Sequence, residues 1–166
     1  NIGKITKAME MISVSKMKKS VQKRSASQSF ADRSFELLEN LHVHKNLTHE
    51  HLEERTGTKI LMVIIASNKG LCGGYNMNVS KEVTKFKNDN EGVTIDAIAV
   101  GKQSEKIARR NGINVIASFN ELSDYYTGGE VRSVLKTITD TYDNDKDYAR
   151  VVVAYTKFVS SLSFDA

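Results

Sequence analysis

The stretch Leu61–Ser67, LMVIIAS, decides the fold of this chain, because it is a continuous apolar run of strand length. Such a run is typical of a strand that is buried on both faces of a parallel sheet. Similar stretches recur at TIDAIAVG (94–101), INVIASF (113–119) and RVVVAYTKFVSSLSF (150–164), the last long enough to bend or to continue as another strand. Helical patterns separate them at 77–87, 103–111 and 130–142. This alternation predicts βαβ units, and hence a Rossmann-like, three-layer α/β domain with a mostly parallel sheet.

The first 55 or so residues follow a different pattern, which predicts one long helix. In this segment Ile2, Ile5, Met9 and Ile12 are spaced by three, four and three residues, as in the seam of a coiled coil. A helix of this length has no core of its own, and no second helix of the same kind follows in the sequence. We therefore expect a helical domain over 1–56, which needs a partner helix, and an α/β domain over 57–166.

The positive charge of the chain is concentrated in this N-terminal segment. Residues 1–24 hold seven basic residues and one acidic residue, a net charge of +6, whereas the whole chain carries +4. The remaining residues are therefore slightly acidic. A basic helix favours an acidic partner, which can be nucleic acid, anionic lipid or protein.

Two further features of composition limit the classes of protein to consider. The single cysteine, Cys72, has no internal partner for a disulfide, which favours a reducing compartment. No apolar run approaches the ~20 residues of a membrane-spanning helix, so we expect no direct insertion into a membrane.

The glycine-rich loop SNKGLCGGYN (67–76) follows the first predicted strand, and open α/β sheets bind ligands beyond this end of their strands. The loop lacks the G-x-G-x-x-G pattern and the Gly-Lys-Ser/Thr ending of a P-loop. A small nucleotide-binding enzyme is a hypothesis that rests on this loop alone. The simpler interpretation is that the glycines permit tight turns and close backbone packing.

Other candidate chemistry is weaker, and we predict no catalytic, metal-binding or cofactor-binding residues. Cys72 has no histidine within the α/β part to activate it as a nucleophile. The four histidines are His42, His44, His49 and His51. Residues two apart on a helix point to different sides, so each H-x-H pair is split. His42 and His49 could share a face, but two ligands without a cysteine or a placed carboxylate make a poor metal site.

Three motifs together resemble the gamma subunit family of F-type ATP synthase. The motifs are ITKAMEMISVSKMKK (5–19), SNKGLCGGYN (67–76) and YTKFVSSLSF (155–164), and they occur in the order and spacing of that family. Two departures stand out. Asn68 occupies a position where the family usually has Asp, which puts any charge contact of that Asp in doubt. The family's C-terminal helix and its first dozen or so residues have no counterpart in this sequence.

The resemblance implies a non-catalytic, central-stalk rotor subunit that couples proton translocation to ATP synthesis or hydrolysis. The N-terminal helix would be half of an antiparallel coiled coil, completed by the family's C-terminal helix. Its ring contacts, to the alpha and beta subunits, would be Lys7, Met9, Met11, Ser13, Lys16, Met17, Lys18 and Lys19. The base of the shaft would include Lys69, Gly70, Leu71, Cys72, Gly73 and Gly74.

The same resemblance implies further partners and a location. An epsilon- or delta-type stalk subunit and the membrane c-ring would bind the chain, with no cofactor and no nucleic acid. The expected location is peripheral, on the cytoplasmic face of a bacterial plasma membrane, or alternatively on the matrix side of the mitochondrial inner membrane. From the residues alone, a nucleic-acid-binding protein with a basic helical arm stays open, since lysines along a helix can follow phosphates.

Overall fold

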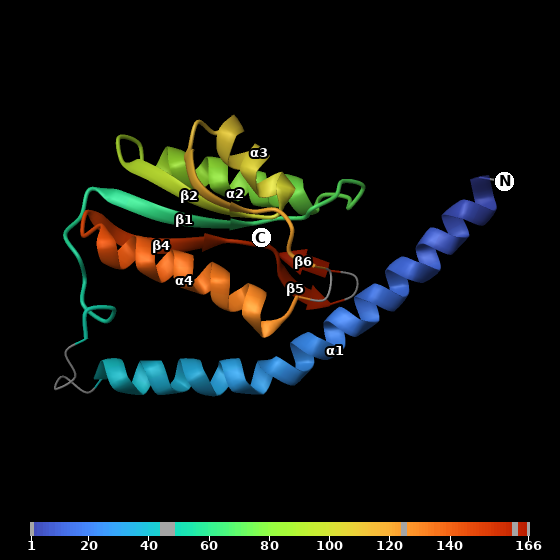
Figure 1. The fold of residues 1–166 in the computed structure, drawn as a ribbon, viewed down its shortest axis with the longest axis horizontal. Coiled ribbons are helices and arrows are strands. Elements are labelled where there is room, and N and C mark those ends of the chain that lie inside the picture. Colours follow the sequence, from blue (N-terminus) through green and yellow to red (C-terminus); the bar gives the residue numbers. More distant parts are fainter. Residues whose placement is uncertain (1, 44–48, 124–125, 161–162, 166) are drawn as a thin grey trace. The chain divides into compact units, whose positions relative to one another are not determined.

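The computed structural model describes residues 2–43, 49–123, 126–160 and 163–165 (Figure 1). The chain divides into two compact units, residues 1–53 and residues 54–166. Each unit has its own architecture and is described by itself.

The first unit is built on one helix, α1 (Ile2–Val43). The serine hydroxyls of Ser27 and Ser34 donate hydrogen bonds to carbonyl oxygens of the preceding turn, a contact that often accompanies bending. The ribbon of α1 is indeed bent (Figure 1). The prediction that the helix continues to about residue 55 is wrong for residues 49–55, which form turns and coil. The sequence 42–49, HVHKNLTH, is rich in His, Val, Asn and Thr, which have lower helix propensity than Ala, although Lys45 and Leu47 are good helix formers.

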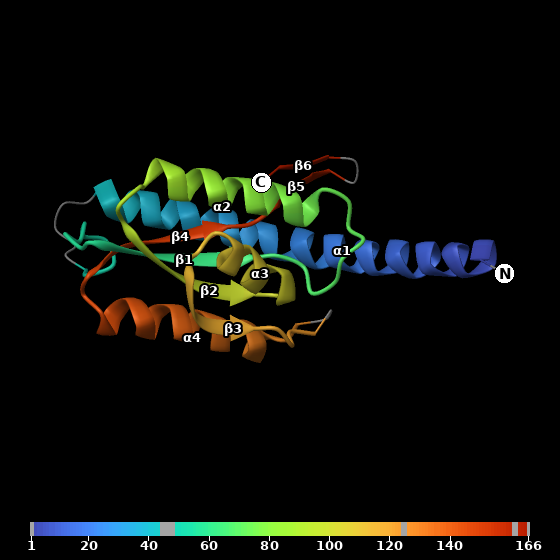
Figure 2. The same ribbon diagram turned by 90° about the horizontal axis from the view of Figure 1, so that it is seen from above.

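The second unit alternates strands and helices as predicted. Its elements are β1 (Lys59–Ile65), α2 (Tyr75–Asp89), β2 (Thr94–Val100), α3 (Lys102–Arg110), β3 (Asn114–Phe119), α4 (Gly128–Asn144), β4 (Tyr148–Ala154), β5 (Lys157–Ser160) and β6 (Ser163–Asp165). Strands β1 to β4 form one parallel sheet in the order β3-β2-β1-β4 (Figure 2). The last predicted strand does continue as another element, because β5 and β6 pair as a separate antiparallel ribbon.

The core lies on both faces of the sheet, as a three-layer domain requires. On one face, Ile60, Met62 and Ile64 of β1 pack against α2 and α3. On the other face, Leu61 packs with the residues that α4 and β4 contribute. Strand β1 is central and pairs with β2 and β4, so its apolar run is buried from residue 60 to residue 64. Figure 1 shows α2 and α3 on one side of the sheet and α4 on the other.

One glycine is required by close packing at the carboxyl edge of the sheet. Gly101, which separates β2 from α3, has a φ of +97°, and a Cβ there would lie 2.2 Å from the carbonyl oxygen of Ala66. Only glycine tolerates both the backbone conformation and this approach. The carboxyl ends of β1 and β2 are therefore held directly against each other, which fixes where the loop after β1 leaves the sheet.

Candidate partner-binding sites on helix α1 and the β1–α2 loop

Every ring contact predicted on α1 is an exposed residue. The apolar members Met9, Met11 and Met17 are 58%, 63% and 42% exposed, and the seam residues Ile5 and Ile12 are 62% and 58% exposed. Within the described residues of its unit, 2–43 and 49–53, α1 is the only helix. A helix that keeps large apolar side chains in water gains stability when another surface covers them.

The helical geometry of α1 divides the predicted contacts between two faces. Each residue advances the direction of its side chain by about 100°. Lys7, Met11 and Lys18 therefore lie on the side opposite to the apolar seam. Lys16 and Lys19 lie on the seam side, beyond Ile12. The lysines of this segment thus cannot all face one partner, and only the first group points fully away from a helix that covers the seam.

The second predicted site, Lys69–Gly74, lies in the loop between β1 and α2, beyond the carboxyl end of the parallel sheet. All six residues are exposed. Leu71 has a φ of +59° and a side chain as exposed as in an extended peptide, at 104%. A non-glycine residue in this conformation costs free energy, and such residues cluster at functional sites. The loop therefore presents a single apolar side chain to solvent at its tip.

The glycines of this loop have unequal roles, which corrects part of the sequence-based interpretation. Gly73 has a φ of +59°, so a turn does require it. Gly74, in contrast, has an ordinary φ of −76° as the residue before α2, and a Cβ there would meet Asn78 at normal contact distance. Around Gly70 and Gly73 a Cβ would meet nothing within 4 Å, so close backbone packing is not their reason.

Hydrogen bonds among loop side chains close the base of the loop. Asn76 accepts a hydrogen bond from the backbone N–H of Ser67 at 3.1 Å and donates to the sulfur of Cys72 at 3.0 Å. The Cys72 thiol is exposed yet engaged in this contact. The loop thus returns to its starting point through Ser67 and Asn76, and its tip projects from a closed base.

Asn68, where the resemblance implies Asp, makes hydrogen bonds through both ends of its side-chain amide. Its Oδ1 accepts from the backbone N–H of Lys102 at 3.1 Å, and its Nδ2 donates to the carbonyl oxygen of Leu122 at 3.3 Å. Asn68 therefore joins the loop after β1 to the start of α3 and to the segment after β3. An aspartate could keep the first contact but has no hydrogen to donate in the second.

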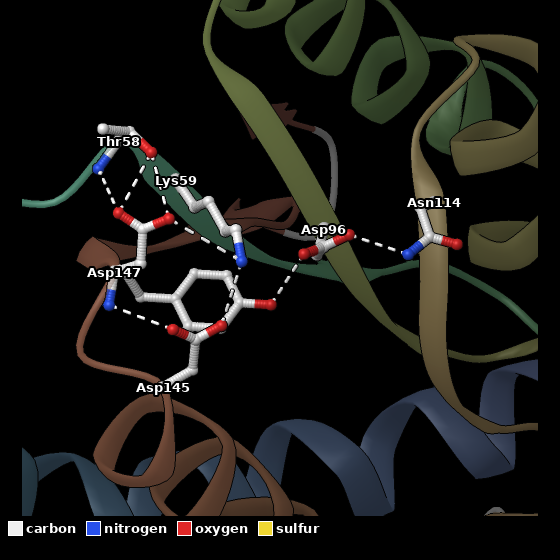
Figure 3. A network of polar contacts seen from close by, with 7 residues as sticks. Thr58, Lys59, Asp96, Asn114, Asp145 and Asp147 are labelled. Carbon is white, nitrogen blue, oxygen red and sulfur yellow. Dashed lines mark hydrogen bonds and ion pairs between the residues drawn. The ribbon is translucent and has the colours of Figure 1, made fainter.

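A polar network at the opposite, amino end of the sheet was not predicted from the sequence (Figure 3). The Tyr148 hydroxyl on β4 donates to Asp96 on β2 at 2.7 Å, and the Asn114 amide on β3 donates to the same carboxylate at 2.8 Å. The Lys59 ammonium on β1 lies 3.1 Å from Asp145 and 3.7 Å from Asp147. The available signal was Asp96, a charged residue within the otherwise apolar stretch 94–101.

The network shifts the pKa values of its members in directions that stabilise the ionised pairs. A hydrogen bond from Lys59 to Asp145, and the charge of that carboxylate, raise the pKa of Lys59. The N–H of Asp147 and then the Lys59 ammonium lower the pKa of Asp145, while Thr58 lowers the pKa of Asp147. Burial, followed by the hydrogen bond to Asp96, raises the pKa of Tyr148, so that the hydroxyl stays protonated and donates. The network ties the amino ends of all four strands together.

A second polar cluster centres on Glu105 of α3. Its carboxylate accepts hydrogen bonds from Asn120 at 3.0 Å, from Arg109 at 2.8 Å and from Ser118 at 3.0 Å. These three donors, led by Asn120, lower the pKa of Glu105 to about 2. The cluster connects α3 to the carboxyl end of β3.

The structure also corrects the geometry considered for the histidines. His49 and His51 are exposed and lie beyond the end of α1, so His49 does not share a helix face with His42. The side chain of His42, and the whole of His44, lie outside the described residues.

The family model described as ATP synthase matches residues 1–166 of the chain. The chain belongs to the ATP synthase family. Its curated relatives include the ATP synthase gamma chain of Variovorax paradoxus, 33% identical over 165 residues, and that of Verminephrobacter eiseniae, 32% identical over 165 residues. In both cases the match covers 98% of this chain and 56% of the relative, so the chain spans about half the length of the relatives it matches.

A solved structure supports the fold of this ATP synthase family member. The chain is similar to a chain in the central stalk and c-ring structure of the Tetrahymena thermophila mitochondrial ATP synthase, with a TM-score of 0.70 and 23% sequence identity. The match covers 96% of this chain and 68% of that chain. The predicted fold class, a long N-terminal helix followed by a parallel α/β domain, is therefore confirmed. None of the helices described here is both long and apolar enough to cross a membrane.

Proposed function

We propose that this chain acts as a non-catalytic, rotor part of an ATP synthase gamma chain and links proton flow to ATP synthesis or hydrolysis. The observation that carries the proposal is α1, a helix of 42 residues with an exposed apolar seam on one side and Lys7, Met11 and Lys18 on the other. A long helix of this kind, followed by an α/β unit with its own core, is consistent with a stalk helix that has a globular domain at its base. Family membership supports the same interpretation.

In this proposal the seam of α1 meets a second, antiparallel helix, and the opposite face meets acidic loops of an alpha/beta ring. Methionine side chains are flexible and polarisable, so Met11 and Met17 would adapt to contacts that change during rotation. An asymmetric shaft touches each beta subunit differently, and coupling follows from those differences in contact free energy. The exposed loop Lys69–Gly74 would contact the ring at the base of the shaft.

The remaining partners in the proposal are an epsilon- or delta-type stalk subunit and the membrane c-ring, which would bind the α/β unit. The location would be peripheral, on the cytoplasmic face of a bacterial plasma membrane. The bacterial sources of the curated relatives favour this location over the mitochondrial inner membrane.

A cross-linking experiment on the assembled complex tests the rotor proposal. In a Cys72→Ser background, Lys18→Cys is labelled with a photoactivatable maleimide and irradiated. We expect cross-links to a ring subunit and a loss of ATP hydrolysis in proportion to their yield, because the shaft is then locked to the ring. Ring cross-links that leave hydrolysis unchanged contradict rotation of this chain.

A matched control uses Lys106→Cys on α3, an exposed position in the α/β unit. Under the proposal, cross-links formed there join components that rotate together, so hydrolysis continues. The nucleic-acid alternative is tested by titrating the chain with labelled duplex DNA at two salt concentrations. Tight binding that weakens steeply with salt would favour that alternative.

A further inference from the structure

The chain enters the α/β unit through residues 55–59, and four of these five residues (Arg55, Gly57, Thr58 and Lys59) lie against the same turn. That turn, residues 142–147, joins the end of α4 to the start of β4. We call residues 55–59 together with residues 142–147 the junction. Its contacts are side chain to backbone, side chain to side chain, and backbone to backbone.

Arg55 makes the outermost attachment of the junction. Its guanidinium lies over the ring of Tyr142, 3.8 Å from the centroid, and its Nη1 donates to the carbonyl oxygen of Tyr142 at 2.6 Å. Its Nη2 approaches the Asp143 carboxylate at 3.4 Å. Only 11% of the Arg55 side chain is exposed. A stacked, charged and largely desolvated contact of this kind is stronger than a surface ion pair.

Arg55 lies against the C-terminal end of α4, and this location explains why the contact is favourable. The last turn of α4 contains no basic residue, although a helix C-terminus carries partial negative charge and unpaired carbonyl oxygens. Arg55 supplies the missing cation from a distant part of the sequence. Tyr142 in turn donates its hydroxyl to the carbonyl oxygen of Ala149 on β4 at 3.3 Å, so the anchor is connected to the sheet.

Gly57, Thr58 and Lys59 continue the attachment beyond Arg55. Gly57 passes so close to the turn that a Cβ would lie 2.0 Å from the carbonyl oxygen of Asp147. Thr58 donates both its backbone N–H and its hydroxyl to the Asp147 carboxylate, each at 3.0 Å (Figure 3). The backbone N–H of Lys59 donates to the carbonyl oxygen of Asp147 at 3.0 Å. Because these contacts share one partner segment, the entering chain separates from the turn only after all of them have opened, with that of Arg55 the first under load.

We propose that the junction is a clamp that carries mechanical load between the helical segment and the α/β unit, with Arg55 as its anchor. The load itself rests on the proposed rotor function. Without the clamp, force on the entering chain would act directly on the amino end of β1, the central strand of the sheet. With it, force is first distributed over the end of α4 and the start of β4.

Single-molecule pulling on the chain itself tests this proposal and needs no partner subunit. In a Cys72→Ser background, handles are attached at Glu53→Cys and Lys106→Cys, so that force passes through the junction. We expect Arg55→Ala to raise the rate of first detachment at a fixed force about tenfold or more, as expected for loss of a charged, stacked contact. Arg55→Lys keeps the charge without the planar stack, and should fall between Arg55→Ala and the wild type.

Two controls separate a clamp from a general contribution to stability. Lys136→Ala removes a cation from α4 that forms an exposed pair with Asp140, and should leave detachment unchanged. Handles at Lys81→Cys and Lys136→Cys bypass residues 55–59, and in that geometry Arg55→Ala should change the rupture rate little. Equal acceleration in both pulling geometries, or none in either, overturns the clamp. Failure of the chain to cross-link with a ring would remove the rotor proposal and leave this result standing.

Discussion

Helix α1 and strand β1 are both rich in large apolar residues, but most of these side chains are exposed to solvent on α1 and buried on β1. On α1, Ile5 and Ile12 leave more than half of each side chain exposed. On β1, Leu61 and Ile64 are completely buried. The strand lies between two neighbours and two layers of helices, whereas the described residues of the helix's own unit contain no second helix.

This difference separates two sources of stability in one chain. Full burial of a side chain such as Leu or Ile contributes roughly 1.5–3 kcal/mol, so the α/β unit accumulates stability from its own sequence. The helix gains the same contribution only when another surface covers its seam. The α/β unit is therefore expected to fold by itself, and the order of α1 is expected to depend on a partner.

The largest difference between α1 and the α/β unit is expected in their rates of amide hydrogen exchange. At a concentration where the chain is monomeric, strands 59–65 and 94–100 should exchange at least about 10³-fold more slowly than residues 5–40, because isolated helices are marginal and core strands open only with global unfolding. The measurement is exchange followed residue by residue by NMR. Similar protection in both regions would show that α1 is stabilised without a partner, and the comparison would fail.

A glycine substitution tests how tightly the α/β unit is packed. Gly101→Ala should reduce the free energy of unfolding by about 3 kcal/mol or more, since it combines a strained backbone with a collision against Ala66. Chemical denaturation measures the change. Gly70→Ala is the matched control, because its Cβ would meet nothing within 4 Å, and its effect should stay within about 0.5 kcal/mol. An equal effect of the two substitutions would contradict the packing argument.

The sequence was sufficient to predict elements whose periodicity is set locally. The apolar run 61–67 identified β1 as a buried parallel strand, because a strand buried on both faces needs no alternation. The helix predicted over 103–111 is α3, and Gly112 just beyond it has a φ of +64°, as is common for a glycine that closes a helix. The prediction placed the end of α1 too late, since residues 49–55 are not helical, because a sequence pattern without a clear stop signal defines helix ends poorly.

Contacts between distant residues could not be predicted in the same way. Arg55 and Tyr142 are separated by 87 positions, and nothing in the local sequence of either indicates the other. The same holds for Tyr148 and Asp96. Their strands, β4 and β2, are the two neighbours of β1, and the long tyrosine side chain reaches across β1 to the carboxylate. The exposed tip at Leu71 was within a predicted site, but its unusual φ depends on the closed base of the loop and is not encoded by Leu itself.

The Glu105 cluster gives a pH-dependent test that concerns the α/β unit alone. Its pKa is about 2 in the folded chain, below the ordinary value of 4.5, so its ionised form stabilises the fold above pH 4.5. That contribution is lost as the pH falls from 4.5 towards 2. Glu105→Gln should therefore lower Tm at pH 7, and the difference from wild type should shrink at pH 2–3. A difference that stays constant over this range would show that the carboxylate charge is not responsible.

A matched control for that experiment is Glu91→Gln, in the turn before β2, where the side chain is exposed. Its Tm should follow that of the wild-type chain across the same pH range. The helix, by contrast, should contribute little to either curve, because the large apolar side chains of its seam are exposed in the free chain.

The smallest effects are expected on α1, and they distinguish the two regions in the assembled complex. In the free chain, Met17→Lys and Lys18→Ala should each change stability by less than about 0.5 kcal/mol, since both positions are exposed. In an enzyme that contains this chain, Lys18→Ala removes one exposed pair worth ~0–1 kcal/mol and should be mild. Met17→Lys replaces an adaptable contact with a cation that pairs at particular rotor angles, and should lower the ratio of proton pumping to ATP hydrolysis by roughly half. Both activities are measured on the same membranes. A wild-type ratio in Met17→Lys would mean that this face of α1 does not couple through weak, adaptable contacts.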